Sequence, residues 1–441
     1  MIKKFKQHLI LNFPFLEGKK ILVAISGGVD SVVLTYLLKK LNYNIYLAHC
    51  NFQLRGNESD LDEEFIKNLG EKFNLETFTI KFSTQEYQNN NKLSIQLAAR
   101  ELRYNWFYKL LKEQKIDYIV TAHHSNDNLE TFIINLTRGT GLEGFTGIPP
   151  INGKTIRPLL KFSREEILQY AKLNSIVWRE DASNTEIKYT RNKIRHNIIP
   201  ILKEINPNLI NSFNNTSNFL QQSQQIINDT IEQKSLEIIS YDGEIKKFDI
   251  KKIKELSNPK AYLYYLLKKY GFTEWNDVFN LIYAQTGKLL TTKSHTLLKD
   301  RDFLLLLPSN KFTNTENQQV TINSSDLKVS YPVNLLFKNV QETTSLDKNT
   351  IYVDKNSLNY PLTLRKWNDG DFFYPKGMLG KKKISKYFKD EKISLIEKQN
   401  IWILCSGKNE IIWILGKRQD RRFLPSDNTI NILQISIYKP L

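Results

Sequence analysis

The hexapeptide SGGVDS, residues 26–31, combines residue types that can bind phosphate. It lies between the apolar run ILVAI and the helical stretch VVLTYLLKKLN. Its glycines let the backbone approach an anion, while the serine hydroxyls and the N–H groups of the following helix can donate hydrogen bonds. The lysine of a GxxxxGK(S/T) loop is absent, and Asp30 lies there instead, where it would suit a Mg²⁺ ion that bridges to phosphates. The alternative is a plain glycine turn in which Asp30 caps the helix.

Two acids, Asp127 and Glu130, stand three positions apart at the start of a predicted helix. This spacing places both carboxylates on one helix face. The alternative role is to complement the helix dipole, which is worth about 0.3–1 kcal/mol. The preceding His123 and His124 have no third ligand at zinc spacing, so we interpret them as polar loop groups, one of which could touch a nucleotide.

An arginine-bearing helix is predicted from the segment LSIQLAARELRYNWFYKLL. Arg100, Arg103, Tyr104 and Phe107 share one face of it, because they are spaced by three and four residues. Beside a phosphate site, a fixed guanidinium would stabilise charge that develops on an α-phosphate. A solvated helix edge is the alternative.

Four strand-like runs, separated by helical periodicity, must position these residues. They are KKILVAI, YNIYLAHC, ETFTIKF and DYIVTA, all within residues 19–138. Such alternation is typical of an α/β fold with a doubly wound, Rossmann-like parallel sheet. Right-handed crossovers place the loops after the strands at one edge of the sheet. We therefore expect residues 26–31, 49–59 and 123–131 to converge on one crevice.

Length and texture predict three domains in the 441 residues. A catalytic α/β domain covers 1–204, an amide-rich and then aromatic helical domain covers 205–325, and a small α+β domain covers 326–441. Residues 308–326 are polar and suggest an exposed connection. The two cysteines are far apart, which excludes a disulfide framework and a four-cysteine zinc site and fits a reducing cytoplasm.

The formal net charge of +17 favours a polyanionic partner. No stretch reaches the roughly 18 apolar residues that span a bilayer, so nucleic acid is preferred over a membrane. Residues 154–203 carry 11 Lys and Arg against 5 Asp and Glu, and residues 361–441 carry 16 against 8. A solvated basic surface is the alternative for both stretches. The predicted polyanion-binding residues in them are Arg191, Arg195, Lys381, Lys382, Lys383 and Lys386, and support of the catalytic site is a second possible role for Arg191 and Arg195.

The whole hexapeptide after a strand resembles the PP-loop of the N-type ATP pyrophosphatases. Further motifs follow in order over residues 26–200, and together they closely resemble the tRNA(Ile)-lysidine synthases. The motifs are HCNFQLRGNES, AARELRYNWF, AHHSNDNLETFIINLTRGTGLEGFTGI, IRPLL, WREDASN and YTRNKIRHNIIP. The segment WNDGDFFYPKGMLGKKKISKYFKDEKI resembles the extra C-terminal domain of the longer members, whereas the resemblance is weak across 205–345.

The resemblance implies an ATP-dependent ligase. In the family, ATP adenylates the C2 oxygen of the wobble cytidine in a CAU anticodon, and L-lysine displaces AMP to give lysidine. Arg103 would then lie near the α-phosphate, Asp127 and Glu130 would hold the lysine ammonium at the reaction centre, and Asp30 would lie near Mg²⁺. ATP would be held by Ser26, Gly27, Gly28, Val29, Asp30 and Ser31.

Three other readings stay open at the level of sequence. A tRNA-thiolating enzyme uses the same adenylation, but two distant cysteines supply neither a catalytic pair nor an iron–sulfur cluster. A small-metabolite amide ligase and a catalytically silent tRNA-binding protein are the others. The expected partners are tRNA(Ile) with a CAU anticodon and L-lysine, with no membrane, and a homodimer is one alternative for the oligomeric state.

Overall fold

The computed structural model describes residues 1–179, 190–309, 319–343 and 347–438. The chain divides into two compact units, Met1–Asp229 and Thr230–Leu441. Residues 310–318 of the predicted connection at 308–326 lie outside the described residues, as do parts of the motifs WREDASN and YTRNKIRHNIIP.

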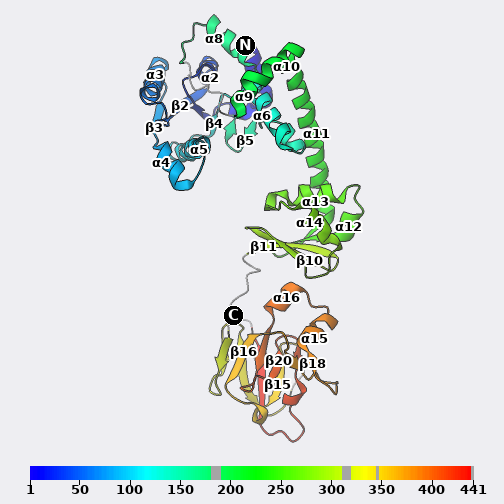
Figure 1. Ribbon diagram of the computed structural model, residues 1–441. Coiled ribbons are helices and arrows are strands. Elements are labelled where there is room, and N and C mark those ends of the chain that lie inside the picture. Colours follow the sequence, from blue (N-terminus) through cyan, green and yellow to red (C-terminus); the bar gives the residue numbers. More distant parts are fainter. Residues whose placement is uncertain (180–189, 310–318, 344–346, 439–441) are drawn as a thin grey trace. The chain divides into compact units, whose positions relative to one another are not determined.

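A six-stranded sheet forms the centre of the first unit, in the order β3-β2-β1-β4-β6-β5 (Figure 1). All its pairs are parallel except β5 with β6. The four predicted strand segments form β1 to β4, so the predicted doubly wound parallel sheet is confirmed. The bounds are β1 Lys20–Ala24, β2 Asn44–Asn51, β3 Thr77–Lys81, β4 Tyr118–Val120, β5 Ile151–Asn152 and β6 Thr155–Ile156.

Helices cover both faces of this sheet. Along β1, Ile21 and Val23 pack with the apolar residues of α1, α2, α3 and α8, whereas Leu22 packs with α5 on the other face, including Phe107. This alternation follows from the two-residue period of a strand. The helices are α1 Ile2–Asn12, α2 Val29–Lys40, α3 Asn57–Phe73, α4 Thr84–Asn91, α5 Ile95–Glu113, α6 Ser125–Arg138, α7 Leu142–Phe145, α8 Arg164–Leu173, α9 Thr190–Lys193, the π-helical η3 Ile194–Ile198 and α10 Ile199–Ile205.

The middle part of the chain contains helices, as predicted, and also an antiparallel sheet that the sequence analysis did not predict. After the long helix α11 (Leu209–Ile238), five strands pair in the order β7-β8-β11-β10-β9, and three short helices pack on them. The strand sequence FLLLLP is rich in leucine, which favours helices when read alone. The bounds are β7 Ile239–Asp242, β8 Ile245–Asp249, α12 Ile250–Lys254, α13 Pro259–Leu267, α14 Trp275–Asn280, β9 Leu289–Thr291, β10 His295–Asp300 and β11 Phe303–Pro308.

The C-terminal part is built on two antiparallel sheets whose side chains share one core, which includes Phe337, Val353, Leu404 and Trp413. One sheet has the order β12-β16-β19-β20-β21 and the other β13-β14-β22-β15. With α15 and α16 they form the α+β fold that the sequence predicts. The bounds are β12 Gln319–Ile322, β13 Lys328–Val329, β14 Leu335–Val340, β15 Thr350–Asp354, β16 Leu362–Lys366, β17 Phe372–Phe373, β18 Lys382–Lys383, α15 Ile384–Asp390, α16 Leu395–Asn400, β19 Trp402–Cys405, β20 Ile411–Ile414, β21 Arg418–Gln419 and β22 Ile432–Ile437.

The predicted domain boundaries at 204/205 and 325/326 remain predictions. Strand β12 precedes the second boundary yet pairs with β16 of the C-terminal sheet. Within the described ranges, no helix is long and apolar enough to cross a bilayer.

Candidate active site

The loop 26–31 lies at the carboxyl end of β1, directly before α2. Gly27 has a φ of +90°, a conformation that glycine adopts without strain, and Gly28 is the N-cap of α2. The Ser31 hydroxyl donates to the Gly28 carbonyl at 3.0 Å and accepts from the Ser26 N–H at 3.2 Å. These bonds fix the shape of the loop. The alternative in which Asp30 is the N-cap is wrong, because Asp30 lies in the first turn instead.

The Asp30 carboxylate is held in this loop without a strong partner. Its Oδ2 lies 3.7 Å from His124 Nε2, and its Oδ1 is buried with no hydrogen bond from the described residues. Burial raises the pKa of Asp30, and the nearby Asp127 charge adds to this, although His124 opposes it. The described residues contain no cluster of three or more His, Cys, Asp or Glu that could form a protein-only metal site. An orphaned carboxylate oxygen does fit Mg²⁺ as proteins usually bind it, through one or two carboxylates plus substrate phosphates.

The raised pKa of Asp30 predicts a stability effect of replacing it with asparagine. The folded-state pKa exceeds the unfolded value, so ionised Asp30 destabilises the fold at every pH above the folded-state pKa. We expect Asp30→Asn to raise the melting temperature at pH 7–8, with a difference that disappears below about pH 4. Thermal unfolding followed across pH measures this.

Asp60→Asn is the matched control for this prediction. The pKa of Asp60 is lowered because its carboxylate accepts hydrogen bonds from Lys81 and Asn51. Its ionised form is therefore favoured in the folded state, so this variant is not expected to raise the melting temperature. An Asp30→Asn protein that melts below the wild type at neutral pH would contradict the raised pKa.

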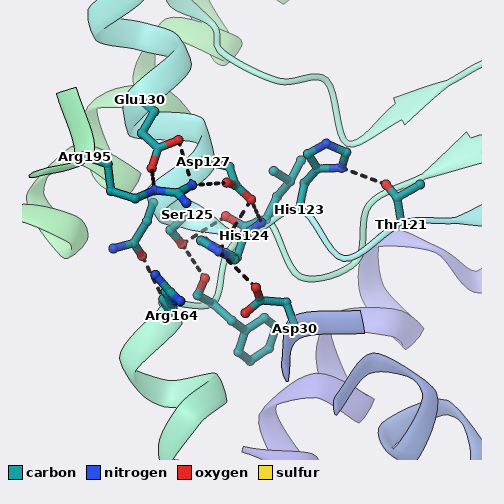
Figure 2. A network of polar contacts seen from close by, with 12 residues as sticks. Asp30, Thr121, His123, His124, Ser125, Asp127, Glu130, Arg164 and Arg195 are labelled. Carbon is teal, nitrogen blue, oxygen red and sulfur yellow. Dashed lines mark hydrogen bonds and ion pairs between the residues drawn. The ribbon is translucent and has the colours of Figure 1, made fainter. Parts of the chain in front are cut away.

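The second part of the site is the first turn of α6, which starts after β4. Asp127 accepts a hydrogen bond from the His124 backbone N–H at 3.1 Å, which fixes the helix start. Glu130 is fully buried, and His124 is 3% exposed. His124 Nε2 lies 3.5 Å from Asp127 and 3.7 Å from Asp30, so it connects the phosphate loop to the acid pair (Figure 2).

Arg195 contacts both acids. Its Nε donates to Glu130 Oε1 at 2.6 Å, and its Nη2 donates to Glu130 Oε2 at 3.1 Å and to Asp127 Oδ1 at 3.4 Å (Figure 2). Arg191 adds an ion pair to Glu130 at 3.3 Å and a hydrogen bond to Thr131 at 2.8 Å. The two carboxylates therefore share one face, as the spacing predicts, and that face binds a cation. Arg191 and Arg195 were predicted to contact tRNA or to support the active site. Arg195 lies on both acids and Arg191 on Glu130, and a tRNA contact of either arginine stays a prediction.

The charges around the acid pair keep Asp127 ionised. Burial alone would raise the pKa of Asp127, but His124, His123 and Arg195 outweigh it and lower the pKa. Burial opposes the charge on Arg195, but the hydrogen bonds to Glu130 prevail and raise the pKa of the guanidinium. At neutral pH the site thus holds a carboxylate that can bind a cation.

Arg103, on α5, lies beside the loop that follows β2. Its guanidinium stands 5.1 Å from the centre of the Phe52 ring. Burial lowers the pKa of His123 to about 4, against the opposing charge of Asp127, and Arg103 is among the cations that add to the lowering. The charge of Arg103 therefore acts on the loop between β4 and α6. Among the described residues it forms no ion pair with Asp127 or Glu130.

A cavity of about 310 Å³ opens beside the acid pair. Glu130 and Arg195 line one part of it, and Arg164 and Lys203 line another. The backbone N–H of Arg164 donates to Asn126 at 3.0 Å, while the buried Nε of its side chain has no hydrogen-bond partner among the described residues. The cavity thus presents acidic and basic groups together.

Comparisons with known proteins extend over the whole chain. A PP-loop domain family matches residues 1–202, a TilS substrate binding domain matches 241–309, and a TilS substrate C-terminal domain matches 362–436. The tRNA(Ile)-lysidine synthase of Parabacteroides distasonis is 39% identical over 427 residues, which cover 95% of this chain and 96% of the relative. The chain belongs to the tRNA(Ile)-lysidine synthase family.

Other relatives agree. The tRNA(Ile)-lysidine synthase of Bacteroides thetaiotaomicron is 39% identical over 440 residues, covering 98% of this chain and 97% of the relative. That of Porphyromonas gingivalis is 36% identical over 427 residues, covering 93% of this chain and 92% of the relative. The similarity includes residues 205–345, where the sequence motifs were weak, and it does not favour the thiolating enzyme or the amide ligase.

The family's C-terminal segment carries the four lysines that the sequence analysis assigned to tRNA. Lys381, Lys383 and Lys386 are exposed. The fourth, Lys382, forms an ion pair with Asp390 at 2.7 Å, and its side chain is 17% exposed. Three of the four are thus exposed and form no ion pair with any described residue.

Two residues have a larger part in this site than their sequence context predicts. His124 was interpreted as a polar loop group that could touch a nucleotide, and it contacts both acidic parts of the site. Arg164 was not singled out, and it lines the cavity. A signal for Arg164 was present: it follows Ser163 in the capping sequence SREE, which fixes a helix start at a sheet edge.

Proposed function

We propose that the protein ligates L-lysine to C2 of the wobble cytidine in the CAU anticodon of tRNA(Ile), with conversion of ATP to AMP and pyrophosphate. The observation that carries this proposal is the contact of one cation, Arg195, with two carboxylates next to a phosphate loop. A site of this kind can bring a cationic substrate to a nucleotide. The tRNA(Ile)-lysidine synthase relatives supply the substrate class.

In the first half-reaction, the loop 26–31 holds the β- and γ-phosphates through its N–H groups and serine hydroxyls. A Mg²⁺ ion near Asp30 would supply charge neutralisation on these phosphates. Arg103 stabilises charge on the α-phosphate while the cytidine C2 oxygen attacks it. Pyrophosphate leaves, and the adenylated cytidine remains.

In the second half-reaction, Asp127 and Glu130 bind the ε-ammonium of lysine in the way that they bind Arg195 here. The lysine amine has an ordinary pKa near 10.4, so it must release a proton before it attacks C2. We assign Asp127 as the acceptor, since it is the more accessible of the two acids: its side chain is 16% exposed, against 1% for Glu130. AMP is then displaced from C2.

Arg164 is proposed to hold the α-carboxylate of the lysine. Its buried Nε has no hydrogen-bond partner among the described residues, and Arg164 lines the same cavity as Glu130. A charge-assisted hydrogen bond of this type is worth about 1.5–3 kcal/mol. We expect Arg164→Ala to raise KM for lysine about 10- to 100-fold and to leave KM for cadaverine, which lacks the carboxylate, unchanged.

Steady-state rates with each amine measure this difference. Lys172→Ala, at the exposed far end of the same helix, is the control. A larger KM for ATP, with an unchanged KM for lysine, would assign Arg164 to the nucleotide instead.

The tRNA is proposed to bind through the basic surfaces, including Lys381, Lys383 and Lys386. Each phosphate contact releases counterions, so affinity must fall steeply with salt. With six or more phosphates engaged, we expect a loss of about 10³ in affinity between 50 and 200 mM salt. Filter binding at several salt concentrations measures the slope, and a flat profile would argue against these contacts.

The decisive experiment incubates the protein with ATP, labelled lysine and tRNA(Ile) that has a CAU anticodon. Label in the tRNA, with AMP and pyrophosphate in equal amounts, is the expected result. A methionine tRNA with the same anticodon is the control. Release of ADP and phosphate, or no label in either tRNA, would reject the function. We place the enzyme in the cytoplasm, where tRNA and ATP are found, and its dimerisation stays a prediction.

A further inference from the structure

The hairpin loop between β17 and β18, residues 374–381, presents an apolar tip to solvent. The two strands pair Phe372 with Lys383 and Phe373 with Lys382. At the tip, Leu379 is 95% exposed and Met378 is 45% exposed. The Leu379 side chain buries almost no apolar surface, so it contributes almost nothing to the stability of the fold.

Arginines of the neighbouring segment hold the backbone of this tip. Arg421 donates from Nη1 to the Met378 carbonyl at 2.7 Å and from Nη2 to the Leu379 carbonyl at 2.8 Å. Arg418 donates to the Lys376 carbonyl at 3.2 Å. We call residues 375–381 the braced loop. Its backbone is fixed by charge-assisted hydrogen bonds, although its side chains project outward.

The anchor of the braced loop is buried. Asp420 is completely inaccessible, and it accepts a hydrogen bond from the Tyr374 N–H at 2.9 Å. The Arg421 N–H in turn donates to the Tyr374 carbonyl at 2.8 Å. Tyr374, at the start of the loop, therefore hydrogen-bonds both to Asp420 and to the backbone of Arg421, whose side chain holds the tip. Fixing a contact loop before binding lowers the entropy lost on association.

The surroundings of the tip are uniformly basic. Residues 372–389 contain six lysines and no acidic residue. Lys382 is paired with Asp390, whereas Lys376, Lys381, Lys383 and Lys386 are exposed. An apolar tip surrounded by lysines complements a partner that has phosphates around an apolar surface. Nucleic acids offer this combination, because bases and ribose edges lie between phosphates.

We propose that the braced loop is a tRNA contact in which Leu379 and Met378 pack against a base or ribose surface. The flanking lysines bind the adjacent phosphates. Arg421 is a positioning residue, since it acts through the loop backbone. This inference rests on the proposed function, because that function supplies the tRNA.

The first test compares Leu379→Asn with Ile430→Asn. Ile430 is 88% exposed in the same part of the chain and serves as the matched control. We expect Leu379→Asn to weaken tRNA binding about tenfold and to raise KM for tRNA, with an unchanged salt slope, because an apolar contact releases no counterions. Lys381→Ala should instead lower the salt slope.

The second test removes the brace. Arg421→Ala should lower the affinity for tRNA about as much as Leu379→Asn does. The double variant should bind tRNA about as well as the more weakly binding single variant, because both changes remove the same contact. Thermal unfolding of each variant shows whether the fold is intact. If Arg421→Ala fails to fold, Leu379→Asn alone decides the proposal.

Two outcomes would overturn the proposed tRNA contact. The first is a wild-type enzyme that forms lysidine together with a Leu379→Asn variant that binds tRNA as tightly as the wild type does. Alternatively, Leu379→Asn could retain tRNA affinity and lose binding to phosphatidylserine vesicles, which would assign the loop to a membrane. A wild-type protein that forms no lysidine would reject the proposed function, so the two failures are distinguishable.

Discussion

Replacing Asp127 with asparagine is expected to lower lysidine formation by about 10²- to 10⁴-fold, the range of general acid–base catalysis. Asparagine keeps an oxygen that can accept the hydrogen bond from the His124 N–H, so the start of α6 is preserved. The change therefore removes mainly the charge that we propose binds the ammonium, and with it the proposed proton acceptor. Pyrophosphate release that depends on tRNA should continue, because adenylation precedes the lysine step.

Single-turnover assays that follow AMP-tRNA and lysidine separately measure this result. Glu204→Gln neutralises an exposed acid near the same helices, on α10, and should change neither product. An Asp127→Asn enzyme with the turnover of the wild type would remove Asp127 as the proton acceptor. Equal loss of both half-reactions would indicate instead that Asp127 serves the nucleotide.

Replacing Arg103 with alanine is expected to slow the adenylation step, whereas Asp127→Asn is expected to slow the lysine step. Removing one group that stabilises a developing charge lowers a rate by about 10²- to 10³-fold. The loss should appear in tRNA-dependent pyrophosphate release, with tRNA affinity largely retained. The fold should survive, because the contact of Arg103 with the Phe52 ring is worth only about 0.5–1 kcal/mol.

Arg100→Ala is the matched control for Arg103. It lies one helical turn earlier on α5, is exposed, and stands 4.9 Å from the Tyr104 ring. The same chemical change there should alter pyrophosphate release by less than about twofold. Equal effects of the two substitutions would mean that Arg103 acts through general charge and not at the α-phosphate.

Together, Asp127→Asn and Arg103→Ala would show whether the two parts of the site serve separate steps of the reaction. In the proposed function, the phosphate loop and Arg103 serve the adenylation step, and the α6 acids serve the lysine step. His124 lies between Asp30 and Asp127, within 3.7 Å of each, so the two steps share one edge of the sheet.

Much of this could be predicted from local patterns. The run KKILVAI forms β1, and the hexapeptide after it forms a loop and a helix start, because glycine conformation and strand composition act over a few residues. The spacing of Asp127 and Glu130 also fixes a shared helix face through the helical period alone. The order of strands and helices then implies the parallel sheet.

Pairings between distant segments could not be predicted in the same way. Arg195 follows Glu130 by 65 residues, and only the packing of η3 against α6 brings its guanidinium onto that carboxylate. Strands β9 to β11 of the middle part are leucine-rich, so their identity depends on the partners they pair with and not on their own preference.

The sequence by itself determined the phosphate loop, the acid pair, the parallel sheet and the excess of positive charge. These depend on residue type and short spacing, which are local. Only the tertiary structure decided which cation contacts the acids, that Lys382 is paired with Asp390 while its neighbours are exposed, and that Arg421 holds the tip at Leu379. Such contacts depend on burial and on segments far apart in the chain, which local spacing does not encode.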